Sequence, residues 1–204
     1  MRQLTCVEAG RLEWQEVPEP RIAGDGEAIV RPLAVARCDI DRLLGAGLFP
    51  MSGPFAVGHE CVGEITALGD AVRGLAIGQR VVVSFQLSCG RCARCRAGHS
   101  AVCEAMPTLS DYGMQPLSGT EYGGMLSDLI RVPFADAMLR PFASHLESVA
   151  LASVSDNVPD GYRAVAPDYY FTKGDLTKIA DMKELMPRVN AKSDAELVAD
   201  LDAT

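Results

Sequence analysis

The chain has no apolar run long enough to cross a membrane and no block of basic residues. A membrane-spanning helix needs about 20 apolar residues in a row, and no stretch of the 204 residues approaches that length. Lys and Arg number 19 against 27 Asp and Glu, a formal net charge of −8 that argues against binding to nucleic acid. Charges also interrupt residues 1–20 too early for a signal peptide. These absences predict a cytoplasmic protein without a membrane or nucleic-acid partner.

Histidine and tryptophan are scarce, with three and one, but there are seven cysteines. An odd number cannot all pair in internal disulfides. Without a secretory signal, clustered thiols more often bind metal than pair. The hydrophobic fraction of 48% and the charged fraction of 23% are ordinary for a chain that buries a core. We therefore expect a folded chain in which some cysteines serve a metal site.

Short strands are predicted over most of the first 140 residues. Turn signals recur roughly every 8 to 15 residues, which is typical of a sandwich or barrel with little helix. The first two strands form a hairpin around Ala9 and Gly10. The sequence therefore predicts a mainly-β fold, with strands within residues 4–9, 11–17, 27–36, 59–69, 79–87, 124–132 and 135–142.

Helical signals begin near residue 144. Ser144 and Glu147 have the spacing of a capping box before an apolar run. Beyond Pro167 the sequence pattern changes, and apolar residues between Leu176 and Met186 recur at helical spacing. We expect one domain over residues 1–166 and a short helical tail over residues 167–204.

Four cysteines lie close together with the spacing C-x2-C-x2-C-x7-C: Cys89, Cys92, Cys95 and Cys103. Four thiolates from one loop can build a closed tetrahedral zinc site with a structural role. An iron–sulfur cluster is the main rival, but its bacterial motif closes with a gap of three and a proline, whereas here the gap is seven and Glu104 follows. Unliganded thiols are the other alternative. His99 could replace one thiol, although a solvated loop histidine is the simpler interpretation.

A second group of potential ligands precedes this loop. Cys38 directly follows a predicted strand, and His59 and Glu60 lie in GHECVGEITALGDAV. Either segment alone would suggest only a buried cysteine or a structural histidine. Together with the cysteine loop they resemble the zinc-containing medium-chain alcohol dehydrogenase family. The resemblance runs to about residue 165, and the signature residues that match are Gly58, His59, Glu60, Gly63, Gly69 and Val72.

This resemblance implies a GroES-like β-barrel domain with two zinc ions per chain, one catalytic and one structural. The catalytic zinc would be held by Cys38, His59 and Asp156, where some members of the family have aspartate and many have cysteine. Glu60 would lie beside the metal and tune it. Asp156 would also suit a helix N-cap. Cys61 is an alternative ligand, because it shares a face with His59 if that stretch is a strand.

The sequence departs from the family at two points. Ile40 stands where members usually carry a hydroxyl that begins a proton relay, so the relay would be absent or rerouted through Asp39 or Asp41, if these are not simply solvated charges. Residues 166–204 are also too few and too poor in glycine for a Rossmann domain. NAD or NADP is therefore expected only if a nucleotide-binding domain is supplied elsewhere, and we expect the isolated chain to be inactive or nearly so.

Three functions follow from these residues. The resemblance implies an oxidoreductase that interconverts small alcohols and carbonyl compounds by zinc-assisted hydride transfer. A non-catalytic zinc-binding interaction module is the alternative, in which a partner chain or an oligomer covers the exposed interdomain face. A zinc hydrolase is the third, although the sequence shows neither its general base nor its pocket.

Overall fold

The structure is a computed structural model, and its described residues belong to one compact unit comprising Met1–Val158. The predicted boundary at residue 166, the helical tail over residues 167–204 and Ser144 lie outside the described residues. Within the described part, no helix is both long enough and apolar enough to span a membrane. The described residues are 1–49, 51, 53–119, 121–142, 145 and 147–156.

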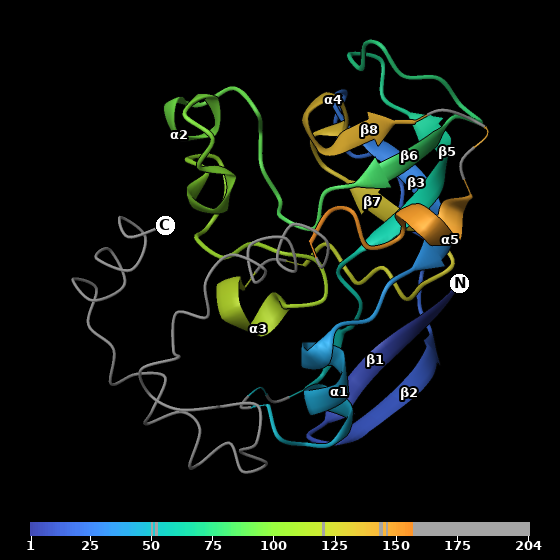
Figure 1. Ribbon diagram of the computed structural model, residues 1–204, viewed down its shortest axis with the longest axis vertical. Helices are drawn as coiled ribbons and strands as arrows, with labels where there is room; N and C mark the ends of the chain where they lie inside the picture. Colours follow the sequence, from blue (N-terminus) through green and yellow to red (C-terminus); the bar gives the residue numbers. More distant parts are fainter. Residues whose placement is uncertain (50, 52, 120, 143–144, 146, 157–204) are drawn as a thin grey trace, which may run out of the picture. The chain divides into compact units, whose positions relative to one another are not determined.

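An antiparallel sheet of five strands forms the larger layer, in the order β7-β3-β5-β6-β8 (Figure 1). Each strand falls within a predicted segment, although the observed strands are shorter. The mainly-β fold class is therefore confirmed. The bounds are Ala28–Val35 for β3, Cys61–Leu68 for β5, Arg80–Val83 for β6, Ile130–Val132 for β7 and Leu139–Pro141 for β8.

A smaller sheet has the order β2-β1-β4, with β1 at Arg2–Glu8, β2 at Arg11–Glu16 and β4 at Phe55–Ala56. The hairpin predicted at Ala9 and Gly10 is present, and Gly10 has a φ of 78° that suits glycine in the turn. The smaller sheet is tied to the segment before β7, because Leu4 N donates to Leu126 O at 2.8 Å.

The segments of the second predicted metal site adjoin the β3–β5 pair, since Cys38 follows β3 and His59 precedes β5. Pro32 is tolerated within β3 because β7 pairs only with residues 28–30, so β3 is an edge strand on that side at Pro32. Gly63 of β5 lies opposite Pro32, and a Cβ there would be 2.3 Å from Cγ1 of Val30. The two strands can approach this closely only because residue 63 has no side chain.

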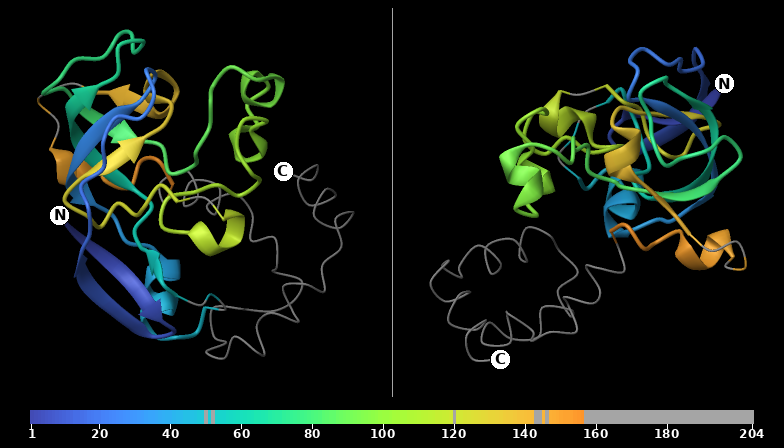
Figure 2. Two further views of the ribbon diagram at one scale, coloured as in Figure 1. Left: turned by 180° about the vertical axis from the view of Figure 1, so that it is seen from behind. Right: turned by 90° about the horizontal axis from the view of Figure 1, so that it is seen from above.

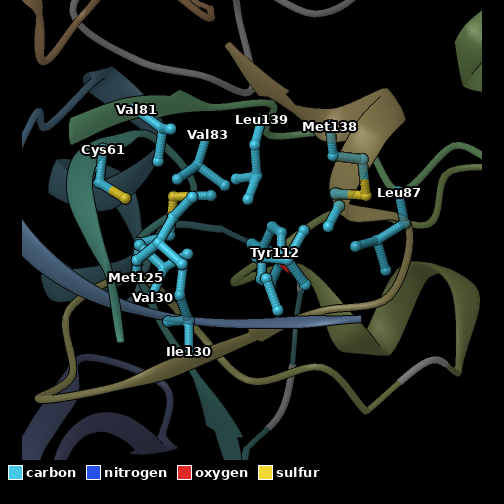
Figure 3. Close-up of a cluster of buried hydrophobic side chains, with 14 residues drawn as sticks. Val30, Cys61, Val81, Val83, Leu87, Tyr112, Met125, Ile130, Met138 and Leu139 are labelled. Atoms are coloured by element: carbon cyan, nitrogen blue, oxygen red, sulfur yellow. The ribbon is translucent and has the colours of Figure 1, made fainter. Parts of the chain in front are cut away.

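The main core lies against the five-stranded sheet (Figure 3). Tyr112 is fully buried there, and its hydroxyl donates to Arg131 O at 2.6 Å, which satisfies the phenol. Cys61 is also fully buried in this core. A second cluster around Leu44 and Phe55 packs beneath the smaller sheet.

The helices are short, and they correct two predictions. Residues 135–142 were predicted to be one strand, but residues 135–138 form a helix before β8 begins. Glu147 was expected at the third position of a helix capped by Ser144. It is instead the N-cap of the last helix and makes no capping hydrogen bond. The helices are α1 at Asp39–Gly45, α2 at Ala93–Arg96, η1 at Ser100–Val102, α3 at Gln115–Ser118, α4 at Ala135–Met138 and α5 at Ser148–Leu151.

Candidate metal centres

The cysteine lobe, residues 88–106, lies away from the five-stranded sheet with α2 at its tip (Figure 1, Figure 2). Neither α2 nor η1 has a buried residue, so these helices contribute no apolar core to the lobe. The four predicted thiols converge there, with their sulfur atoms all within 4.8 Å of one another. A metal ion bound by these thiols would supply the cohesion that side-chain packing does not.

Backbone N–H groups point at the sulfur atoms of this group. Cys92 N donates to Sγ of Cys89 at 3.4 Å, and Cys95 N donates to Sγ of Cys92 at 3.4 Å. The N–H groups of Cys95 and Glu104 lower the pKa of the Cys92 thiol to about 6. Such donors stabilise the thiolate form that metal binding requires. His99 is exposed on the loop and lies outside this cysteine group.

Helix α1 positions Cys38 in the second centre. Cys38 is its N-cap, and its Sγ accepts from Ile40 N at 3.3 Å. Asp41 completes a capping box, because its Oδ2 accepts from Cys38 N at 2.9 Å. Burial raises the pKa of the Cys38 thiol, so a neighbouring cation is the partner that would favour its thiolate. The sequence analysis did not predict α1, which the capping pair Cys38 and Asp41 now explains.

His59 lies just before β5 and is 5% exposed. Its ring meets Phe85 edge-on, with 6.5 Å between the ring centroids. Carboxylates lie near both of its nitrogens. Asp156 Oδ2 is 3.3 Å from Nε2, and Asp41 Oδ1 is 3.9 Å from Nδ1. The imidazole therefore lies between two acidic side chains from segments far apart in the sequence.

Glu60 connects Asp156 to the site. It is fully buried, and its Oε1 accepts from Asp156 N at 2.6 Å. Asp156 itself lies in the turn that follows α5, and the residues after it, on which an N-cap role would depend, lie outside the described part. The carboxylate of Glu60 thus fixes the backbone of the predicted ligand.

The donor set fits a zinc ion on two observations. The Oδ1 atom of Asp41 is buried and has no hydrogen-bond partner among the described residues. An unpaired buried carboxylate oxygen costs free energy, and a bound cation or a closer contact with His59 would recover it. The 3.3 Å between His59 Nε2 and Asp156 Oδ2 matches the edge of about 3.4 Å expected for a zinc tetrahedron with bonds near 2.1 Å. Cys38, Asp41 and His59 each offer a donor atom within 4.8 Å of the others, a group that does not include the predicted ligand Asp156.

Comparison with known proteins identifies the family of the chain. The model of the alcohol dehydrogenase GroES-like domain matches residues 24–141. The chain belongs to this family. Zinc-type alcohol dehydrogenase B of Aspergillus flavus is 30% identical over 166 residues, which cover 81% of this chain and 37% of that protein. A probable zinc-binding alcohol dehydrogenase of Mycobacterium tuberculosis is 29% identical and is covered over 41% of its length.

Solved structures give the same result for the fold. The alcohol dehydrogenase TADH from Thermus sp. ATN1 is 30% identical with a TM-score of 0.70, over 79% of this chain and 46% of that one. The alcohol dehydrogenase of Aeropyrum pernix is 25% identical with a TM-score of 0.63, over 81% and 47%. This GroES-like chain therefore spans less than half the length of each of these relatives.

Two residues differ from what the sequence predicted: one was expected to be a possible ligand, and the other was not singled out. Cys61, the alternative ligand, instead lies in the core against Val81 and Val83, and burial raises its pKa far above the ordinary value. Asp111 was not predicted at all. Residues 110–112 pair with residues 85–87, where Leu87 N donates to Ser110 O and Tyr112 N donates to Phe85 O. No local sequence signal indicates this long-range pairing.

Proposed function

We propose that this GroES-like domain is the zinc-bearing half of an oxidoreductase that interconverts small alcohols and carbonyl compounds. The observation that supports this most is the arrangement at His59, which shares a group of close donor atoms with Cys38 and Asp41 and whose Nε2 lies 3.3 Å from Asp156 Oδ2. Membership of the alcohol dehydrogenase family gives the same reaction class. A zinc ion held there would supply Lewis-acid polarisation of the substrate oxygen.

The residues around His59 would have different roles at this centre. Cys38, His59 and Asp156 would hold the ion, and with two anionic ligands the set is electrically neutral around Zn²⁺. Asp41 would accept a hydrogen bond from Nδ1 of His59 and so fix the ring and its tautomer. Glu60 holds the Asp156 backbone in place. Ile40 packs against the second core cluster and provides no hydroxyl for a proton relay.

We propose a separate structural role for the four-cysteine group. Its ligands are Cys89, Cys92, Cys95 and Cys103, which leave no position open on a tetrahedral ion. This second zinc would stabilise the cysteine lobe and take no part in turnover. The full complement is therefore two zinc ions per chain.

The nicotinamide cofactor would be bound by a Rossmann domain outside the described residues. All strand pairs in the described part are antiparallel, whereas a Rossmann fold is built from parallel βαβ units. A zinc-binding dehydrogenase from Sinorhizobium meliloti, 27% identical with a TM-score of 0.56, was solved bound to NADP. We infer that NAD or NADP accepts the hydride here too, and that the 204-residue chain alone turns over little or no alcohol.

A chimera tests this function. A Rossmann domain from a zinc-type alcohol dehydrogenase would be fused after residue 166, and alcohol-dependent reduction of NAD⁺ and NADP⁺ would be followed by absorbance. We expect turnover from the chimera, and none from the 204-residue chain or from the chimera carrying His59→Ala. A folded, zinc-loaded chimera that is inactive with a panel of primary, secondary and polyol substrates would contradict the proposal and favour the interaction module.

A further inference from the structure

Asp111 is a half-buried carboxylate beside the proposed catalytic centre. The bridge between Gln86 and Asp111 places it one residue from Phe85, whose ring touches His59. Burial raises the pKa of Asp111 to about 6, while the charge of His59 lowers it and that of Asp156 raises it. Its side chain nevertheless makes no hydrogen bond or ion pair among the described residues.

A half-buried carboxylate without a hydrogen-bond donor is costly, a cost that the charge of His59 reduces and that of Asp156 increases. Most carboxylates of this region are already engaged: Asp41 accepts from Cys38 N, and Glu60 accepts from Asp156 N. Asp41 uses its Oδ2 and leaves Oδ1 unpaired, whereas neither carboxylate oxygen of Asp111 has a hydrogen-bond donor in the described part of the chain. A ligand entering the centre could satisfy it by donating a hydrogen bond.

The charge around the centre sets the sign of that ligand. The proposed zinc, thiolate and Asp156 sum to zero, which leaves the carboxylates of Asp41, Glu60 and Asp111. Arg37 is exposed, and it lines a small cavity of 70 Å³ together with Asp41, so it offsets at most one of these charges. An anionic substrate would therefore meet net repulsion, whereas an uncharged one would not.

We propose that Asp111 is a specificity-determining residue, which accepts a hydrogen bond from a second hydroxyl of an uncharged alcohol and repels anionic alcohols such as hydroxy acids and sugar phosphates. The inference depends on the proposed function, because it assigns a substrate class to the same centre. It would set this chain apart from relatives named for anionic substrates, such as the L-galactonate-5-dehydrogenase and the galactitol-1-phosphate dehydrogenase of Escherichia coli.

Three probes with the same three-carbon chain test the inference on the 204-residue protein loaded with cobalt. They are 1-propanol, 1,3-propanediol and 3-hydroxypropane-1-sulfonate, which end in a methyl, a hydroxyl and a sulfonate group. The cobalt spectrum reports ligands at the open centre, because the four-thiolate centre has no free position. We expect the diol to bind most tightly and the sulfonate most weakly.

Substitutions at Asp111 separate its charge from its hydrogen bond. Asp111→Asn keeps an acceptor oxygen but removes the charge, and should tighten sulfonate binding by roughly 3- to 30-fold while largely keeping the preference for the diol. Asp111→Ala should remove that preference as well. Asp70→Asn is the matched control, since Asp70 is an exposed turn residue in a distant loop.

Two results would overturn the inference, and they are distinguishable. Sulfonate affinity that changes no more in Asp111→Asn than in Asp70→Asn, in protein that still binds 1-propanol, would contradict the role of Asp111 alone. A cobalt-loaded wild-type protein whose spectrum responds to none of the alcohols would contradict the open centre itself, and with it both the proposed function and this inference. Thermal unfolding of each variant verifies that it is folded.

Discussion

At the scale of single residues, the candidate catalytic centre depends on how two carboxylates share one imidazole. Asp156 approaches Nε2 of His59 at 3.3 Å, and Asp41 lies 3.9 Å from Nδ1. A metal can bind only one of these nitrogens. The shorter distance fits a zinc ligand, and the longer one fits a residue that orients the ring. The two aspartates should therefore differ in what their removal does.

Asp156→Ala should abolish zinc binding at the centre, because it removes a ligand. Asp41→Asn should weaken zinc binding by roughly 10- to 100-fold, the usual effect of losing a partner of a ligating histidine. Competition with a chromogenic chelator measures both, and the zinc of the cysteine lobe serves as the internal control. A greater loss in Asp41→Asn than in Asp156→Ala would place the metal on Nδ1 instead.

The cysteines should differ in reactivity once zinc is removed. Cys92 has a pKa lowered to about 6 by backbone donors, whereas Cys95 has one raised to about 12, chiefly by burial. Chelation should open the lobe and remove these contacts, so in the chelated protein Cys92 and Cys95 should both return toward ordinary thiol behaviour and be alkylated at similar rates, whereas the buried Cys61 should stay slow to react. Mass spectrometry of iodoacetamide-treated protein locates the label. Preferential labelling of Cys61, which is fully buried, would contradict this order.

At the scale of elements, the strands and the helix after residue 144 could be predicted, and the other short helices could not. Alternation and turn residues predicted all the strands of the five-stranded sheet. Helix α1 was missed because its N-cap is a cysteine, a residue that does not usually indicate a helix start. Residues 135–138 alternate like a strand, yet they turn as a helix that buries Ala135 and Met138 in the core. An unusual N-cap explains the first case, and packing explains the second.

Gly63→Ala should destabilise the domain by about 1–3 kcal/mol, because the added methyl group would overlap Val30 across the β3–β5 pair. Gly26→Ala is the matched control, since a Cβ there meets no atom within 4 Å. Urea unfolding of the two zinc-loaded variants gives the difference. Equal midpoints would show that β3 and β5 are not packed as closely as described.

The cysteine lobe should behave as a separate unit of stability. Its helices bury no side chains, so chelation of its zinc should expose residues 88–106 to rapid hydrogen exchange. The strands β5 and β6 bury their own apolar side chains in the main core and should stay protected. Exchange measured by mass spectrometry before and after chelation distinguishes these cases. Equal loss of protection in lobe and sheet would mean that the zinc supports the whole domain.

At the scale of the whole molecule, the sequence motifs predicted the family and the two groups of potential ligands. The cysteine spacing and the His59 segment carry local signatures, so both groups were recognisable before the fold was known. The neighbourhoods of Asp41 and Asp111 were not, because they depend on contacts between segments far apart in the chain. The chain also spans less than half the length of the relatives described above.

The most direct test of the account is zinc stoichiometry combined with X-ray absorption at the zinc edge. Two chemically different centres predict two zinc ions per chain that share five sulfur ligands, an average of about 2.5 per ion with the rest nitrogen and oxygen. His59→Ala should leave one ion with four sulfur ligands. A wild-type chain that binds a single zinc ion through sulfur alone would contradict the open catalytic centre.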